Sequence, residues 1–365
     1  MKKVAKKIRS LVALILSALV LFTVFTLFSC DSGYRTFVSD DYFNTAVEIS
    51  VKGKAFERET KNAIVSLLGR YDDELSLAKP SSSVARFNEA VAGEKISVSE
   101  EFSELFLKSK DFYSKTDGYF NSAVYPLLKL WKLSSDTYDA VRTQPFIPDD
   151  ADIEICKSLA LKFQAVSCND GVAEKDTDGV KLDFGGIAKG VVADKLAEIL
   201  IGCGYGNGFV NVGGSSQRIF GDYGDLSVKH PRKTNDTGDF ALTVKSTLLR
   251  NKGVSTSGDY QRFYADENGN RYSHLINVKT GKPADGGFCS VTVIGETACD
   301  CDAISTYLSL LDKESFITAI KTKTAEYTVF AFYEKDGEKL FVTNEKQSEN
   351  YALLDTSYDL TVVKI

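Results

Sequence analysis

The chain carries no excess of positive charge. Its 365 residues include 44 Lys and Arg against 50 Asp and Glu, which gives a formal net charge of −6 at pH 7. General nucleic-acid binding needs a basic face, so this balance argues against it. Internal repeats, low-complexity tracts and a linker that would divide the chain are also absent. With ordinary aromatic and charged content, the composition predicts one unit with a large packed core.

Familiar metal and nucleotide motifs are missing as well. Cys299 and Cys301 have no second cysteine pair or histidine cluster beside them, so they do not form a zinc signature. The sequence contains no Walker A loop. The glycine-rich stretch 202–208 follows a predicted helix and precedes a strand, whereas a dinucleotide-binding turn follows a strand and opens a helix. Besides Cys30, six cysteines remain, and an exported protein could pair them in any of 15 ways. Their mostly apolar or helical contexts favour buried free thiols over disulfides.

The first thirty residues have the pattern of an export signal. A basic stretch over 1–9 precedes an apolar run over 11–28 and the ending Leu27-Phe28-Ser29-Cys30. This ending resembles a bacterial lipobox, which implies cleavage before Cys30 and lipidation of its thiol. An uncleaved transmembrane anchor is the alternative, because the run is nearly long enough to span a bilayer. Both alternatives place the remainder outside the cytoplasmic membrane.

We therefore expect an exported lipoprotein anchored to the outer face of that membrane. The expected organisation is a signal peptide (1–29), a lipidated tether (30–40), a globular domain (41–345) and a C-terminal tail (346–365).

Predicted helices and strands are interspersed without the regular spacing of βαβ units. Apolar residues at helical spacing predict helices over 55–76, 153–161 and 298–311, and a capping-box pattern from Ser97 predicts another. Strands are predicted at 42–51, 209–212, 240–244 and 290–294, with hairpin turns near 267–270 and 335–337. This mixture favours the α+β class.

The stretch 180–194 is the first candidate site. A short apolar strand is predicted before Gly185-Gly186, and a helix after them. A glycine turn at a helix N-terminus exposes backbone N–H groups and the positive end of the helix dipole, which suits a phosphate. Asp183 and Lys189 add an acceptor and a cation. Plain chain geometry is the alternative interpretation of such a corner.

A second candidate lies on the predicted helix that begins near residue 298. Asp302 and Thr306 are four residues apart and share one helical face. A carboxylate and a hydroxyl offer two hard oxygen ligands of the type that Mg²⁺ prefers. Charge complementing the helix dipole, with Thr306 bonded back to its own helix, is the structural alternative.

Only two histidines are present, and His274 is one of them. It is the side chain best suited to act as a general base near neutral pH, although a lone histidine is often structural. Ser257-Gly258-Asp259-Tyr260 has the mix of small residues, carboxylate and aromatic ring that a ligand loop needs. Loops also have this composition by default.

Taken together and in order, these stretches resemble the ApbE family of FAD:protein FMN transferases, which are often exported lipoproteins. The resemblance covers roughly residues 40–345. The motifs that carry it are Phe43-Asn44-Thr45, Asp117-Gly118-Tyr119-Phe120-Asn121, Leu182-Asp183-Phe184-Gly185-Gly186-Ile187-Ala188-Lys189-Gly190, Asn211-Val212-Gly213-Gly214, Ser255-Thr256-Ser257-Gly258-Asp259-Tyr260, Tyr272-Ser273-His274 and Thr297-Ala298-Cys299-Asp300-Cys301-Asp302-Ala303-Ile304-Ser305-Thr306.

The resemblance implies a T-fold-like α+β domain that binds FAD and Mg²⁺. It implies transfer of FMN from FAD to a Thr or Ser hydroxyl of a partner protein, with release of AMP. Asp302, Thr306 and the Gly186 carbonyl would hold the metal, and His274 or Asp259 would act as the base. Residues expected to contact FAD are Phe43, Thr45, Tyr119, Phe120, Asn121, Asp183, Lys189, Ser257, Gly258, His274 and Ile276.

Three positions depart from the family pattern. Phe43-Asn44 stands where Met-Gly is common, Asn121 replaces a common Asp, and Ser215 stands where an Asp often follows the glycine pair. None of them touches the Asp302–Thr306 pair.

The same residues would hydrolyse FAD to FMN and AMP if water replaced the acceptor hydroxyl. A flavin-binding lipoprotein without activity is a second alternative, and a sugar- or peptide-binding lipoprotein is the general one. By resemblance, the acceptor would be a subunit of an Rnf- or Nqr-type membrane complex or another exported flavoprotein.

Overall fold

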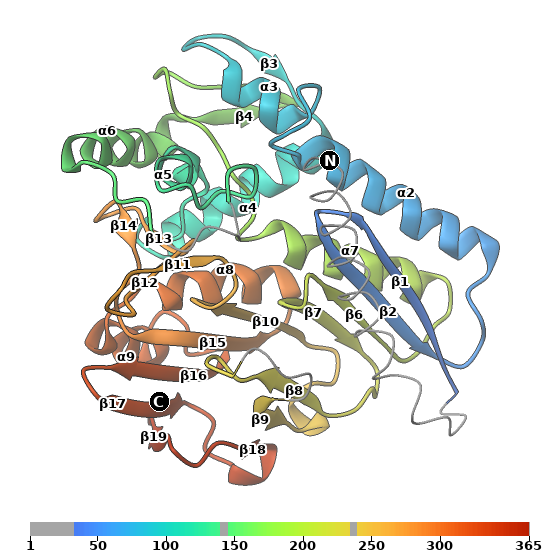
Figure 1. The fold of residues 1–365 in the computed structure, drawn as a ribbon. Coiled ribbons are helices and arrows are strands. Elements are labelled where there is room, and N and C mark those ends of the chain that lie inside the picture. The colour runs from blue at the N-terminus through green and yellow to red at the C-terminus, as the bar shows by residue number, and fades with distance from the viewer. Residues whose placement is uncertain (1–32, 139–144, 234–238, 365) are drawn as a thin grey trace, which may run out of the picture.

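A nine-stranded sheet forms the centre of the molecule in this computed structural model, which describes residues 33–138, 145–233 and 239–364 (Figure 1). Neighbouring strands run antiparallel, except that β17 and β19 are parallel. Across the sheet the order is β1 (Tyr34–Tyr42), β2 (Thr45–Lys52), β6 (Gly208–Val212), β7 (Ser216–Phe220), β10 (Gly253–Gly258), β15 (Phe288–Gly295), β16 (Thr328–Lys335), β17 (Glu338–Thr343) and β19 (Asp359–Val362).

Both faces of this sheet are covered. Helices α7 (Ala188–Gly202) and α8 (Ala298–Ser309) pack against β6, β7, β10 and β15 on one face. A small sheet of β8 (Leu226–Lys229), β9 (Phe240–Val244) and β18 (Tyr351–Leu353) covers the other face and encloses a second apolar core. Strand β15 is therefore buried along its whole length, which explains why its sequence is nearly all apolar or small.

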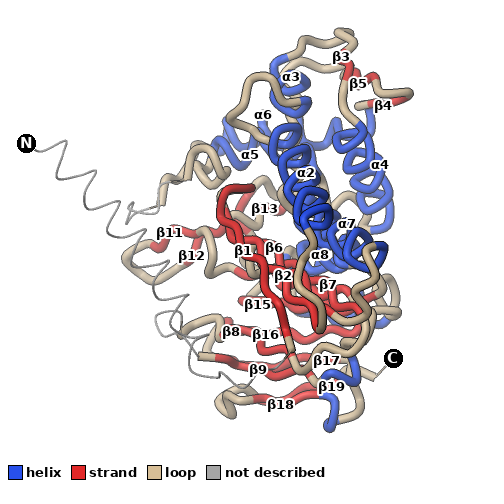
Figure 2. The backbone as a smooth tube through the Cα atoms, turned by 90° about the vertical axis from the view of Figure 1, so that its right-hand side faces the viewer, coloured by secondary structure: helices blue, strands red, loops and turns tan. Residues whose placement is uncertain are grey.

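The remaining helices gather above the sheet in Figures 1 and 2. They are α2 (Arg58–Leu75), α3 (Ser83–Glu89), α4 (Glu100–Lys115), α5 (Tyr125–Leu130) and α6 (Asp150–Ala160), with a small sheet of β3 (Ile96–Ser97), β5 (Val172–Glu174) and β4 (Ser167–Asn169) beside them. Helix α9 (Lys313–Lys321) follows α8 along the chain. The short hairpins β11–β12 (Phe263–Ala265, Arg271–Ser273) and β13–β14 (Ile276–Asn277, Lys282–Pro283) complete the fold. This mixture of helices and antiparallel strands confirms the α+β prediction.

Side-chain caps set several helix starts. Ser99 caps α4 by accepting a hydrogen bond from the Phe102 amide at 3.2 Å. The capping-box pattern predicted Ser97 for this role, but Ser97 pairs with Val172 in the small sheet, and the helix begins two residues later than predicted. Thr297 caps α8 by accepting from the Asp300 amide at 3.0 Å. The cap fixes where α8 begins and hence which residues of α8 face the sheet.

Both flanking segments predicted from the sequence differ in the structure. The expected tether 30–40 overlaps β1, which pairs with β2 along most of its length and forms one edge of the main sheet. The expected tail 346–365 contains β18 and β19, which pair with β9 and β17. The folded unit therefore runs from β1 to β19. Edge strands of mixed polar sequence such as β1 lack the clear alternation that identifies a strand.

The expected signal peptide 1–29 and Cys30 lie outside the described residues. Within those residues, no helix has both the length and the apolar character that crossing a membrane requires. All six cysteines of the described part are free thiols, as the sequence predicted, and Cys168, Cys289, Cys299 and Cys301 are buried.

Candidate active site

A cavity of about 410 Å³ lies where the upper helices meet the main sheet. Its volume is in the range of small-molecule sites. Residues from all parts of the chain meet there, because the β1–β2 turn, the start of α7, the end of β10 and one face of α8 converge. The residues predicted from sequence that line it are Phe43, Thr45, Tyr119, Phe120, Asn121, Asp183, Gly186, Lys189, Ser257, Gly258, His274, Ile276, Asp302 and Thr306.

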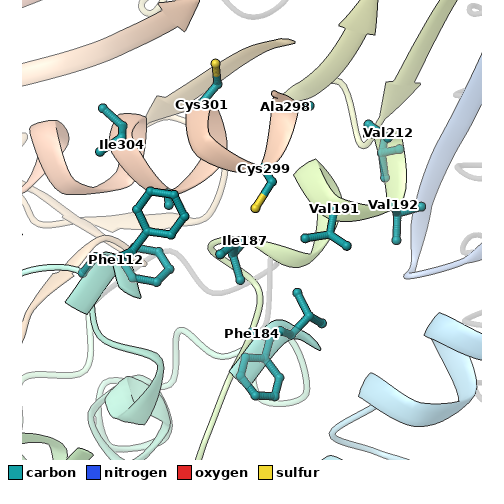
Figure 3. Packing of buried hydrophobic residues seen from close by; sticks show 14 of the residues in the cluster. Phe112, Phe184, Ile187, Val191, Val192, Val212, Ala298, Cys299, Cys301 and Ile304 are labelled. Carbon is teal, nitrogen blue, oxygen red and sulfur yellow. The ribbon is translucent and has the colours of Figure 1, made fainter. Parts of the chain in front are cut away.

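The corner before α7 is built by local hydrogen bonds and two apolar anchors. The Asp183 carboxylate accepts from the Gly185 amide at 2.6 Å, and the amides of Ile187 and Ala188 donate to the Phe184 carbonyl. Phe184 and Ile187 are buried in the main core, beside Val191 on the helix (Figure 3). The corner therefore has little freedom to move. Burial raises the pKa of Asp183, and the Gly185 amide opposes that shift.

The predicted strand before this corner has no regular secondary structure and belongs to no sheet. The side chain of Asn88 replaces a strand partner: its amide donates to the Leu182 carbonyl at 2.9 Å, and its oxygen accepts from the Leu182 amide at 2.6 Å. Buried Lys175 donates to the carbonyls of Phe87 and Val180. Sequence reasoning missed both residues. Asn88 is far from Leu182 in the sequence, and Lys175 belongs to no recognisable motif.

Asp302 is the charged centre of the cavity floor. Its side chain is only 4% exposed. It accepts from the Gly190 amide at 3.1 Å and from the Ser255 hydroxyl at 3.2 Å, and the Lys189 ammonium lies 3.7 Å away. Burial raises its pKa, and Lys189 and the Gly190 amide act in the opposite direction. Asp302 therefore faces the cavity and the start of α7 rather than simply capping its own helix.

Thr306 lies one turn further along α8. Its hydroxyl donates to the Asp302 carbonyl at 3.0 Å, as the structural alternative expected, and the Ser257 hydroxyl lies 3.4 Å from the same oxygen. Ser257 can occupy at most one lone pair of Thr306, which leaves the other for a ligand in the cavity that both residues line. A Cβ added to Gly186 would be 3.7 Å from this hydroxyl, so the Gly185-Gly186 backbone adjoins it.

One carboxylate, one hydroxyl and nearby backbone carbonyls make a set of hard oxygen donors that fits Mg²⁺. In the described chain no cluster of three or more His, Cys, Asp or Glu is arranged for a metal.

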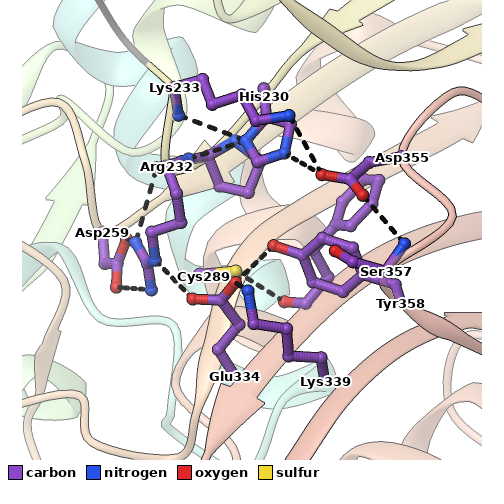
Figure 4. A network of polar contacts seen from close by, with 12 residues as sticks. His230, Arg232, Lys233, Asp259, Cys289, Glu334, Lys339, Asp355, Ser357 and Tyr358 are labelled. Carbon is purple, nitrogen blue, oxygen red and sulfur yellow. Dashed lines mark hydrogen bonds and ion pairs between the residues drawn. The ribbon is translucent and has the colours of Figure 1, made fainter.

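Asp259 does not belong to the cavity, which corrects its assignment as a candidate base. Its carboxylate forms a two-pronged ion pair with Arg232, at 2.7 and 3.0 Å (Figure 4). Arg232 also donates to Glu334 at 2.7 Å, and Glu334 accepts from the Tyr358 hydroxyl. Both carboxylate oxygens of Asp259 thus accept hydrogen bonds from Arg232, and Asp259 does not line the cavity. Its role is to tie the loop after β10 to the C-terminal segment.

Asp259→Asn is therefore expected to lower the free energy of unfolding by about 2 kcal/mol, because Arg232 loses a charged partner in a mostly buried pair. Chemical denaturation measures this loss. If the chain has the FMN transfer activity that the family resemblance implies, its rate well below the melting temperature is expected to stay within a few-fold of wild type, whereas loss of a general base lowers a rate 10²- to 10⁴-fold.

The control for this prediction is Glu267→Gln, an equivalent change of charge at an exposed turn residue. It is expected to change neither stability nor rate. A 10²-fold loss of rate in a stably folded Asp259→Asn protein would restore Asp259 as the base.

His274 lies in the cavity wall, and its surroundings favour the neutral ring. Its Nδ1 lies 3.3 Å from the Arg262 carbonyl, so the neutral ring donates from Nδ1 and keeps Nε2 as an acceptor. Burial lowers the pKa of His274 to about 3, and the Arg262 charge acts in the same direction. The expectation of an ordinary pKa near neutrality is therefore wrong for the ligand-free protein. An anionic ligand beside the ring would raise the pKa again.

In the ligand-free protein, NMR of the imidazole is expected to show no titration of His274 between pH 8 and 5, because its pKa is lowered to about 3. The neutral ring contributes stability that is fully present above the unfolded pKa of about 6.5 and is lost as pH falls toward the folded value. The protein has two histidines, so His274→Gln assigns the resonance. A midpoint near 6.5 would contradict the buried geometry.

Several cavity residues were missed by sequence reasoning. They include Arg262, the second cation of the wall, and Gln261, Tyr138 and Ser135. Arg262 follows the Ser257–Tyr260 motif by two residues, and only the fold shows that it turns inward.

Comparisons with known proteins show which proteins this chain resembles. A family model described as "ApbE family" matches residues 43–330. A protein of Escherichia coli K12 named FAD:protein FMN transferase is 29% identical, over 79% of this chain and 83% of its own length. A protein of Klebsiella pneumoniae with the same name is 25% identical, over 86% of this chain and 93% of its own length.

Solved structures show the same fold. The flavin transferase ApbE from Vibrio cholerae aligns with a TM-score of 0.71 at 21% identity, covering 85% of this chain and 97% of that one. The ApbE protein from Thermotoga maritima aligns with a TM-score of 0.69 at 28% identity, covering 82% and 94%.

Proposed function

Because the chain belongs to the ApbE family, and its relatives are named FAD:protein FMN transferases, we propose that it transfers FMN from FAD to an acceptor protein. The finer proposal is that transfer depends on Mg²⁺, forms a phosphoester on a Thr or Ser hydroxyl, and releases AMP. The observation that carries it is the meeting of Asp302, Thr306, Gly186 and Lys189 at one end of the cavity.

The cavity residues divide the work of binding. Phe43, Tyr119 and Phe120 offer ring surface to the flat ends of FAD. The amides at the start of α7 and the Lys189 ammonium suit the pyrophosphate. Asp302, Thr306 and the Gly186 carbonyl would hold Mg²⁺, which when bound neutralises phosphate charge. The corner is already fixed by Phe184 and Ile187, so binding does not have to order it.

The proposed chemical step exchanges one P–O bond for another. The acceptor hydroxyl oxygen bonds to the phosphorus on the FMN side, the anhydride P–O bond breaks, and its electron pair leaves with AMP. The hydroxyl proton passes to Nε2 of His274 and then to solvent. Phosphate charge beside His274 raises its pKa when FAD is bound, which makes the neutral ring a better base at that moment.

We also propose that the chain is exported and lipidated at Cys30, which rests on residues 1–30 of the sequence. An acceptor would then lie on the same side of the membrane: an Rnf- or Nqr-type subunit or another exported redox protein. Hydrolysis of FAD by water is the competing activity, since the same residues activate the same pyrophosphate.

The test uses the chain from Asp31 onward with FAD, Mg²⁺ and a protein that carries an acceptor threonine, followed by intact mass and AMP release. A flavin adduct that EDTA abolishes supports the transferase. AMP and free FMN without an adduct support a pyrophosphatase. Bound FAD that stays intact overturns both and leaves a flavin-binding protein.

A further inference from the structure

Among the described residues, two permanently charged cations, Lys189 and Arg262, line the cavity, and they differ in their hydrogen-bond partners. Lys189 donates to the Gly185 carbonyl at 2.7 Å and lies 3.7 Å from Asp302. Arg262 makes a single side-chain hydrogen bond to the described residues, a long one of 3.4 Å to the Leu133 carbonyl. Within the described chain, no carboxylate lies within ion-pairing distance of its guanidinium (4.0 Å). A guanidinium carries five N–H donors, so most of those of Arg262 have no partner in the part of the chain that the structure describes.

The backbone of Arg262 is held by hydrogen bonds, whereas its guanidinium has few hydrogen-bond partners among the described residues. Its carbonyl accepts from the His274 amide at 3.0 Å and faces Nδ1 of the same ring. The guanidinium is largely buried, and that burial lowers the pKa of Arg262 while the charge of Asp183 opposes the shift. A desolvated cation without an anion is costly unless a ligand supplies the partner.

The charges of the cavity point to the nature of that ligand. Asp183 and Asp302 balance Lys189 and Arg262, so the protein wall is close to neutral. A pyrophosphate diester brings two negative charges, and the fork of an arginine matches phosphate oxygens better than an ammonium does. Of the two cations, Arg262 has the free N–H donors that could bind the pyrophosphate oxygens.

We propose that Arg262 is a substrate-binding residue whose guanidinium clamps the pyrophosphate of the dinucleotide. This rests on the proposed function, because it names the contact that selects FAD over flavins without a pyrophosphate. Lys189 and Arg262 then hold the pyrophosphate from two sides. Neither the flavin ring nor the adenine is the partner of Arg262.

Binding of FAD, ADP and riboflavin tests this, with the full chain in detergent and EDTA present to prevent turnover. Arg262→Gln is expected to weaken FAD and ADP by about 10- to 100-fold, the size of lost charge-assisted hydrogen bonds. Riboflavin, which has no phosphate, is expected to bind as in wild type. Arg262→Lys keeps the positive charge but loses the paired N–H donors of the guanidinium. Its affinities for FAD and ADP are expected to lie between those of wild type and Arg262→Gln.

The matched control is Arg271→Gln. Arg271 lies in the same hairpin region but outside the cavity, where it stacks on Phe263 at 4.2 Å. It is expected to leave all three affinities unchanged.

Equal losses for FAD and riboflavin in Arg262→Gln would overturn the proposal and make Arg262 a support of the cavity wall; so would no loss at all. If Arg262→Gln does not fold, Arg262→Lys decides by the same comparison. A wild-type protein that binds no FAD defeats the proposed function itself. Wild-type transfer together with an unaltered Arg262→Gln defeats only this inference.

Discussion

Asp302→Asn is expected to lower FMN transfer by on the order of 10³-fold. Asp302 is the only carboxylate in the proposed metal-binding donor set, and it is also the counter-charge of Lys189 at 3.7 Å. The substitution keeps the size of the side chain and removes its charge. Rates of adduct formation at increasing Mg²⁺ measure the effect, and added metal is not expected to restore wild-type rates.

Stability separates this effect from misfolding. Burial raises the pKa of Asp302, so the ionised carboxylate costs free energy in the metal-free protein. Removing the charge is therefore expected to leave the melting temperature unchanged or to raise it.

Asp300→Asn is the matched control for Asp302→Asn, because Asp300 is on the same helix but outside the cavity. It is expected to retain activity. Wild-type transfer by Asp302→Asn, or a loss that follows unfolding, would remove Asp302 from the centre of the site.

Gly190→Ala is expected to lower the free energy of unfolding by about 3 kcal/mol or more. Gly190 is where α7 crosses closest to α8: an added Cβ would lie 2.4 Å from the Ala298 carbonyl oxygen and 2.7 Å from the Cys299 Cα. Both obstacles are backbone atoms, which cannot rotate away. Alanine's better helix propensity offsets only about 1 kcal/mol. Chemical denaturation measures the loss.

Activity is expected to fall together with stability, because moving α8 away breaks the 3.1 Å bond from the Gly190 amide to Asp302. The control is Gly202→Ala at the other end of the same helix, where an added Cβ meets nothing within 4 Å. It is expected to be neutral or to stabilise by up to about 1 kcal/mol. A Gly190→Ala protein as stable as Gly202→Ala would mean that the two helices are not in close contact there.

The predicted residues that line the cavity could be proposed from the sequence because each sits in a short local pattern. Asp183 and Lys189 flank a glycine pair, and Asp302 and Thr306 share a helical face. Patterns of this length report local conformation directly, and their order along the chain identified the family. The α+β class followed for the same reason, since periodicity reveals the type of element without its partners.

Errors arose where local patterns are ambiguous. Asp259 stands in a motif beside the cavity, but its direction depends on Arg232, and that arginine comes from a loop 27 residues away. The pKa of His274 depends on burial by distant segments. Residues 34–40 and 351–362 looked like flanking chain, and they are strands because β2, β9 and β17 lie beside them.

The sequence by itself determined the fold class, the family and about half of the residues that line the cavity. Only the tertiary structure decided which of them face one another, which side chains are already paired, and that Arg262 is a cation with free donors. The physical reason is that a side chain's direction, its burial and its electrostatic partners are set by segments far away in the chain. Those segments meet only when the sheet and helices have packed.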